Sequence, residues 1–134
     1  MFGRNRRNKL ISSRCPLSDN DFVSQVAART ELQKLIIATR EALARVCEIP
    51  AGFVHPDDEP ELYLQFFTTG WDDIAVVMEL EESLNIKIKD DDKFPSFLGW
   101  RFFWFKKQGP STVGEWCSSV AEYLNSNYIK RQVG

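Results

Sequence analysis

The residue types that carry nucleophilic, redox or metal chemistry are few in this chain: Cys15, Cys47, Cys117 and His55. The thiols are odd in number and far apart, and no two have the spacing of a zinc or dithiol site. The single histidine lies in His55-Pro56-Asp57-Asp58, a run typical of a turn. We therefore predict free thiols in a reducing, cytoplasmic compartment and a solvated loop histidine.

Two acidic runs, Asp57 to Glu59 and Asp90 to Asp92, are the other groups that could hold a ligand, in this case calcium. Neither has the alternating ligands and the closing glutamate of an EF-hand loop, so we interpret both as solvated loops. A glycine-rich phosphate loop is also missing from the sequence. These patterns predict a protein that is not an enzyme and that uses no metal and no cofactor.

Charge divides the chain into two parts. The formal net charge of the 134 residues is -2, but residues 1–14 hold five basic side chains and no acid, so the remainder is acidic. Residues 1–17 lack periodicity, and we predict a flexible basic tail there and a helical domain over residues 18–134. The tail could weakly contact an anionic membrane, nucleic acid or the domain itself, or be a cleaved targeting peptide; a solubilising arm is the interpretation we prefer.

One soluble domain with one core fits the composition, since 43% of the residues are hydrophobic and 27% are charged. No apolar run approaches the roughly 20 residues that a transmembrane helix needs. The chain therefore predicts no transmembrane segment.

Three amphipathic stretches predict the helices. The first runs from the N-cap residues at 18–21 to about Cys47, with a restart near Arg29 suggested by the Thr30/Gln33 capping box, and Pro50 follows its end. A long loop over residues 50–69 comes next, with core anchors predicted at four positions. These anchors are Leu62, Leu64, Phe66 and Phe67.

The second helix is predicted over Asp72 to Leu84 and is closed by Asn85. Its inward-facing residues should be Ile74, Val77, Leu80 and Leu84, spaced at helical intervals. The third begins at the capping box formed by Thr112 and Glu115 and frays near residues 125–130. Its apolar stripe consists of Val113, Trp116, Cys117, Val120 and Leu124.

The run Thr69-Gly70-Trp71-Asp72-Asp73-Ile74, followed by Leu80-Glu81-Glu82, resembles the second helix of acyl carrier proteins. In that family this helix opens with Asp-Ser-Leu and continues to a Leu-Glu-Glu run. The Thr112-Val113 start also resembles the family's last helix, so the resemblance covers residues 29–128. It implies a mainly α fold, a helical bundle with a long first loop, and an acidic body that docks on basic surfaces.

Matching Leu80-Glu81-Glu82 places Gly70 where the family has the serine that carries phosphopantetheine, and Trp71 where it has leucine. Glycine offers no hydroxyl for that attachment. The chain therefore looks closest to uncharacterised bacterial carrier-like proteins that lack this serine. A carrier modified at a non-standard hydroxyl, Thr68 or Thr69, is the alternative.

Residues 93–107 depart from the family and form an aromatic insertion before the last helix. Five of the six residues from Trp100 to Phe105 are aromatic, with basic residues among and after them. Packing in the core is the interpretation we prefer. An exposed protein- or ligand-binding patch comes second, and insertion into a membrane surface or stacking on single-stranded nucleic acid third.

We therefore expect a non-enzymatic interaction module that binds another protein in an unknown pathway. An adaptor for membranes or nucleic acids, using the basic tail, is a further alternative. Candidate partner-binding residues lie on the second helix and in the aromatic segment. They are Trp71, Asp72, Asp73, Glu79, Glu82, Trp100, Phe103 and Trp104.

Overall fold

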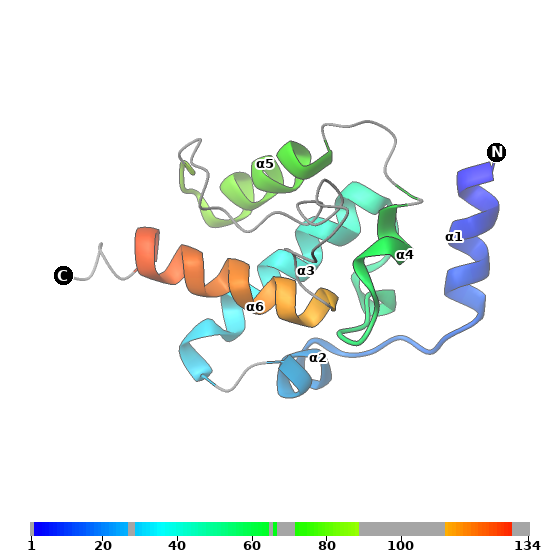
Figure 1. The fold of residues 1–134 in the computed structure, drawn as a ribbon, viewed down its shortest axis with the longest axis horizontal. Helices are drawn as coiled ribbons and strands as arrows, with labels where there is room; N and C mark the ends of the chain where they lie inside the picture. The colour runs from blue at the N-terminus through cyan, green and yellow to red at the C-terminus, as the bar shows by residue number, and fades with distance from the viewer. Residues whose placement is uncertain (1, 27–28, 65, 67–71, 89–111, 130–134) are drawn as a thin grey trace, which may run out of the picture.

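The fold is built around helix α3, Gln33–Cys47, in a computed structural model that describes residues 2–26, 29–64, 66, 72–88 and 112–129 (Figure 1). Helix α5, Asp72–Leu84, and helix α6, Val113–Leu124, both pack against α3, and the short helix α2, Asp19–Val26, packs against α3 and α6. In Figure 1, α5 and α2 lie at opposite edges, with α3 and α6 between them. Over the described ranges the regular structure is helical and contains no strand, which confirms the mainly α class.

Helix α3 is buried on most of its circumference because three helices pack against it. Leu35, Ile36 and Leu43 are buried in the core, and Val46 is half-buried. Thr39, which interrupts the apolar stripe, is also fully buried; its hydroxyl donates to the Leu35 carbonyl at 2.7 Å. This bond within the helix satisfies the polar group, so threonine is tolerated in the core.

Both α3 and α5 end at a residue in the left-handed conformation. Glu48 has φ 59°, and the Ile49 amide donates to the Ala44 carbonyl at 3.0 Å. Asn85 has φ 53°, and the Ile86 amide donates to the Glu81 carbonyl at 3.1 Å. These bonds satisfy carbonyls that a helix end leaves open. The bounds predicted for α5, and Asn85 as the residue that closes it, are confirmed.

Helix α6 follows the sequence prediction closely. The Thr112 hydroxyl accepts from the Glu115 amide at 3.1 Å, which is the N-cap bond expected there. All five predicted stripe residues are buried. A π-helical turn, η4, continues the chain over Asn125–Ile129, where fraying was predicted.

The first predicted helical stretch consists of the helices α2 and α3 with a short 3₁₀ turn before α3. The Ser18 hydroxyl accepts from the Asp21 amide at 3.1 Å at the start of α2, as its N-cap position suggests. The capping box at Thr30 and Gln33 is wrong: Thr30–Leu32 forms a 3₁₀ turn, η1, that has no side-chain cap, and α3 starts at Gln33. Tertiary packing of Leu32, which is buried, accompanies this tighter turn.

Residues 2–12 form a helix, α1 (Phe2–Ser12), where the sequence predicted an irregular tail. Leu10 is buried, and Arg7 Nε donates to the Cys47 carbonyl at 2.7 Å, at the end of α3. A cation is favourable at this end of the helix dipole. The contact comes from single residues, not from an apolar stripe, so periodicity could not reveal it.

The predicted loop over residues 50–69 contains a 3₁₀ turn, η2 (Ala51–Phe53), and a short helix, α4 (Pro60–Leu64). Phe66 is buried as predicted, and Leu62 is half-buried. Tyr63, which the sequence analysis did not select, is fully buried and contacts Phe66 edge-on with ring centroids 6.4 Å apart. Phe67 and the Leu64 side chain lie outside the described residues.

On α5 the predicted Val77, Leu80 and Leu84 pack in or against the core, and one further residue joins them. Leu80 is fully buried, while Val77 and Leu84 are half-buried. Val76, which was not selected, is 1% exposed. The way α5 packs against α3 determines which of its residues are buried. The spacing of apolar residues along α5 alone does not predict this orientation. The Ile74 side chain lies outside the described residues.

Two buried groups that lose a proton at alkaline pH, the Cys117 thiol and the Tyr63 hydroxyl, predict a loss of stability there. Burial raises the pKa of Cys117 above 9.0, and burial together with the Asp58 hydrogen bond raises that of Tyr63 above 10.0. Above about pH 9 the unfolded chain binds fewer protons than the folded one, so the free energy of unfolding should fall, by up to about 1.4 kcal/mol per pH unit and group. Urea unfolding of the wild type and Cys117→Ala between pH 8 and 11 checks this. The variant should lose stability about one pH unit later; identical curves would contradict it.

Candidate interaction surfaces

The first candidate site is the outward side of α5, here called the α5 surface and defined by Met78, Glu79, Glu82 and Ser83. Met78 is 61% exposed and is the one large hydrophobic side chain of the described residues with such exposure. Glu82 lies one helical turn later and is exposed as well. An exposed apolar side chain next to a carboxylate suits contact with a partner that offers an apolar pocket and a cation.

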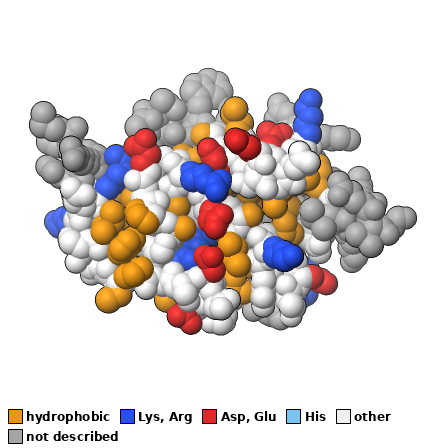
Figure 2. Space-filling model, turned by 180° about the vertical axis from the view of Figure 1, so that it is seen from behind, with side chains coloured by type: hydrophobic (Ala, Val, Ile, Leu, Met, Phe, Trp, Pro, Cys, Tyr) orange, Lys and Arg blue, Asp and Glu red, His pale blue; other side chains and the backbone are white. Residues whose placement is uncertain are grey.

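Glu79 is less available than the sequence predicted. Its carboxylate lies 3.3 Å from Arg45 Nη1 of α3, and the same nitrogen donates to the Ser83 hydroxyl at 2.9 Å. Arg45 also lies 3.8 Å from Glu41. The outer surface is therefore a mixture of charges where α5 meets α3, not a continuous acidic one. Figure 2 shows acidic, basic and hydrophobic side chains next to one another in the middle of the face seen from behind.

The structure places only part of the predicted partner-binding set. Glu79 and Glu82 lie on α5, and Asp72 and Asp73 form its first turn, although their side chains are not among those described. The remaining candidates lie outside the described residues, as does Gly70, for which the sequence analysis predicted the position of the family's serine. These are Trp71, Trp100, Phe103 and Trp104. The aromatic insertion therefore stays a prediction.

Arg40, which sequence reasoning missed, is a buried side chain with several partners among the described residues. It is 1% exposed; Nη2 donates to the Leu17 carbonyl at 2.8 Å and to the Val54 carbonyl at 3.0 Å. Nη1 lies 2.9 Å from Asp19, and the guanidinium covers the Phe22 ring at 4.4 Å. Burial lowers the pKa of Arg40, and Asp19 opposes this shift. These contacts fasten α2 and the η2 segment to α3, so the role is structural.

Asp58 forms a second internal cluster and corrects the interpretation of residues 57–59 as a solvated loop. Its Oδ2 accepts from Arg14 Nη1 at 2.7 Å, from the His55 amide at 3.1 Å and from the Tyr63 hydroxyl. The Asp58 hydrogen bond is the main cause that raises the pKa of Arg14. Asp57 and Glu59 are exposed, as predicted. His55 is half-buried, with Nε2 3.0 Å from the Cys15 carbonyl.

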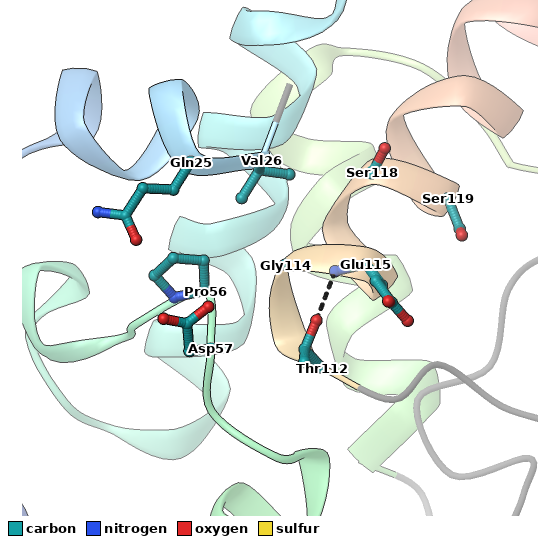
Figure 3. Close-up of a pocket in the computed structure, with 9 residues that line it drawn as sticks. All are labelled: Gln25, Val26, Pro56, Asp57, Thr112, Gly114, Glu115, Ser118 and Ser119. Carbon is teal, nitrogen blue, oxygen red and sulfur yellow. Dashed lines mark hydrogen bonds between the residues drawn. The ribbon is translucent and has the colours of Figure 1, made fainter. Parts of the chain in front are cut away.

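The second candidate site is a hollow of about 530 Å³ between the end of α2 and the start of α6, here called the α2–α6 hollow (Figure 3). Val26, Pro56 and Gly114 contribute its non-polar part. Its polar side chains are Gln25, Asp57, Thr112, Glu115, Ser118 and Ser119. Among the described residues the lining thus has carboxylates, hydroxyls and an amide, and no basic side chain.

The described residues hold no group of three or more His, Cys, Asp or Glu side chains that could bind a metal ion. All three cysteines are in the thiol form, with Cys15 exposed and the other two buried. Over the same parts of the chain, no helix has both the length and the apolar character needed to cross a membrane.

Comparison of the chain with protein-family models, with curated proteins and with solved structures finds no match in any of the three.

Proposed function

We propose that this chain is a non-enzymatic, carrier-protein-like domain without a phosphopantetheine attachment serine, and that it acts by binding another protein through the α5 surface. The observation that carries the proposal is Met78, which is 61% exposed beside the exposed Glu82. Burial of such a side chain in a partner contributes about 1.5 to 3 kcal/mol, enough to make it a principal contact.

The partner that suits this surface offers an apolar pocket flanked by Lys or Arg. Glu82 supplies a carboxylate one turn from Met78, and the chain after residue 14 is acidic overall. Complementary charge speeds association and orients the partner. The resemblance to carrier proteins supports the same arrangement, because in that family the second helix docks on basic surfaces.

The basic-arm alternative has less support than the α5 surface. Arg7 and Arg14 are two of the five basic residues at the N-terminus, and both are used inside the fold, on the Cys47 carbonyl and on Asp58. Arg6 and Lys9 remain exposed. A carrier modified at Thr68 or Thr69 involves residues outside those described and stays an alternative.

The α5 surface is tested with a Met78→Asp/Glu82→Lys variant. Proteins that co-purify with the tagged wild type from its native host should be lost with this variant, and an individual partner should bind at least about tenfold more weakly. Quantitative mass spectrometry identifies the partners, and titration of the strongest one gives the dissociation constants.

The matched control is Glu122→Lys, which changes the charge at an exposed position of α6 and should retain the partners. An unchanged partner set with the α5 variant would contradict the proposal. The intact mass of the native protein separates the carrier alternative, because a phosphopantetheine increment would show that a hydroxyl is modified.

A further inference from the structure

Helix α1 lies at the edge of the molecule, beside α4, and an extended segment joins it to α2 (Figure 1). Among the described residues, α3 packs closely with α2, α5 and α6, and α1 is not one of the helices that pack in this way. Of the α1 side chains that the structure describes, Leu10 is the one that is buried. Little apolar area therefore holds α1 to the domain, and its few polar contacts decide whether it stays.

The segment that follows α1 is fixed to the domain by its own bonds. The Leu17 amide donates to the Gly52 carbonyl at 2.7 Å. Arg14 Nη1 donates to the Phe53 carbonyl at 3.2 Å and to the Asp58 carboxylate at 2.7 Å. None of these bonds involves a residue of α1, so α1 can leave its position while the chain after it stays in place.

The Arg7 side chain makes the main polar contacts of α1, at a surface here called the latch site and defined by Cys47, Glu48 and Phe66. Nε donates to the Cys47 carbonyl at 2.7 Å, and Nη2 donates to the Phe66 carbonyl at 3.4 Å. Nη2 also lies 3.5 Å from the Glu48 carboxylate, and the guanidinium lies 5.6 Å from the centre of the Phe66 ring. These acceptors, at the negative end of the α3 dipole, suit a guanidinium, whose N–H groups reach several oxygens at once.

Leu10 supplies the apolar part of the same contact. It follows Arg7 by three positions, so the two side chains lie on one side of α1. Leu10 belongs to the buried cluster that also contains Cys47 and Phe66. Arg6 and Lys9, by contrast, are exposed. What the latch site holds is therefore an arginine and a leucine three positions apart on a helix.

We infer that α1 is a reversible latch, which leaves the latch site while the rest of the domain stays folded, and that the vacated site binds a partner helix with arginine and leucine at this spacing. An isolated helix of 11 residues is marginal in water, so α1 unfolds when it leaves. While it is bound, α1 competes with the partner helix at an effective concentration of about millimolar. The inference does not rest on the function proposed for the α5 surface, because the two surfaces share no residue.

Hydrogen exchange of the full-length protein tests the opening of the latch. In the wild type, the Leu10 amide should exchange at least about 100-fold faster than that of Leu43, which lies in the centre of the fold and opens only with it. Arg7→Gln should speed the exchange of Leu10 by a further factor of about ten and leave that of Leu43 within about twofold.

Arg6→Gln is the matched control, because it removes a neighbouring arginine whose side chain is exposed. It should change the exchange of Leu10 by less than about twofold. If the Leu10 and Leu43 amides of the wild type exchange at the same rate, α1 opens only with the whole domain and the latch is refuted.

Binding to the vacated site is tested with a synthetic peptide of residues 2–12, acetylated and amidated, and the full-length Arg7→Gln/Leu10→Ser variant. The amides of Glu48 and Phe66 should shift saturably in two-dimensional NMR spectra, with a dissociation constant of about 1 mM or below. The wild type should bind the peptide at least about tenfold more weakly, because its own α1 fills the site.

The peptide sequence separates specific binding from charge attraction. A peptide with Arg7→Lys should bind the variant at least about fivefold more weakly, although its charge is unchanged, and one with Arg6→Gln should bind within about twofold. Absence of saturable binding up to about 5 mM would overturn the proposed recognition. Equal binding to the wild type and the variant would do so too, as would equal losses from the changes at residues 6 and 7 of the peptide.

Discussion

Replacing Arg40 by alanine is expected to lower the free energy of unfolding by about 3 kcal/mol or more. The change leaves the carbonyls of Leu17 and Val54 without their donor in a buried site, and each such loss costs about 1 to 3 kcal/mol. It also removes the guanidinium that covers the Phe22 ring. Thermal and urea unfolding measure the effect, and the melting temperature should fall by about 10 °C.

Arg45 provides the matched control, because it is an arginine of the same helix with an exposed side chain. Arg45→Ala should cost less than about 1 kcal/mol, although it breaks the bonds to Glu79 and Ser83. Arg40→Lys separates charge from geometry: an ammonium group cannot reach Asp19 and the carbonyls together, so it should recover less than half of the loss. Equal effects of the Arg40 and Arg45 replacements would show that Arg40 does not join the elements.

The parts of the fold that the sequence predicted are those with local causes. Helix α5 has its acidic first turn and Asn85 at its end, and α6 has the Thr112 cap and a regular apolar stripe. Each of these features acts within a few residues along the chain. Their bounds therefore follow from propensity and capping alone.

The parts that escaped prediction depend on contacts between distant residues. Arg7 reaches Cys47 across 40 positions, and Arg14 reaches Asp58 across 44. Arg40 is a charged residue on a helix, and nothing near it in the sequence indicates that three carbonyls of other segments surround it. Side-chain partners of this kind are brought together by the tertiary structure. The hydrophobic periodicity of the sequence therefore does not predict them.

The residues of the two candidate sites also differ in whether the sequence predicted them. Glu79 and Glu82 were both predicted as partner-binding residues; Glu82 is exposed, whereas Glu79 binds Arg45. Met78 was not selected, because a stripe counted on α5 does not show which side α3 covers. The hollow joins residues of three segments, Gln25, Asp57 and Ser118 among them, and a linear pattern cannot bring these together.

Replacing Asp58 by alanine should have the second largest effect on the free energy of unfolding, although the acidic run around Asp58 is typical of a solvated loop. Its Oδ2 accepts from an arginine, a tyrosine and a backbone amide, and these donors come from the segment after α1, from α4 and from the turn at His55. Asp58→Ala removes all three bonds and leaves the buried Tyr63 hydroxyl without this acceptor. We expect a loss of about 2 to 3 kcal/mol by urea unfolding.

The neighbouring Asp57 is the matched control for Asp58, because it has the same side chain but is exposed, whereas the Asp58 side chain is mostly buried. Asp57→Ala should change the stability by less than about 0.5 kcal/mol, as expected for an exposed residue. A double-mutant cycle of Asp58→Ala with Arg14→Ala should give a coupling of about 1 kcal/mol, since the pair is mostly buried. Because Arg14 anchors the segment that follows α1, both variants should also speed amide hydrogen exchange at Leu10. Additive effects in the cycle, with unchanged exchange at Leu10, would mean that Asp58 holds only its own turn and does not tie the N-terminal helix to the domain.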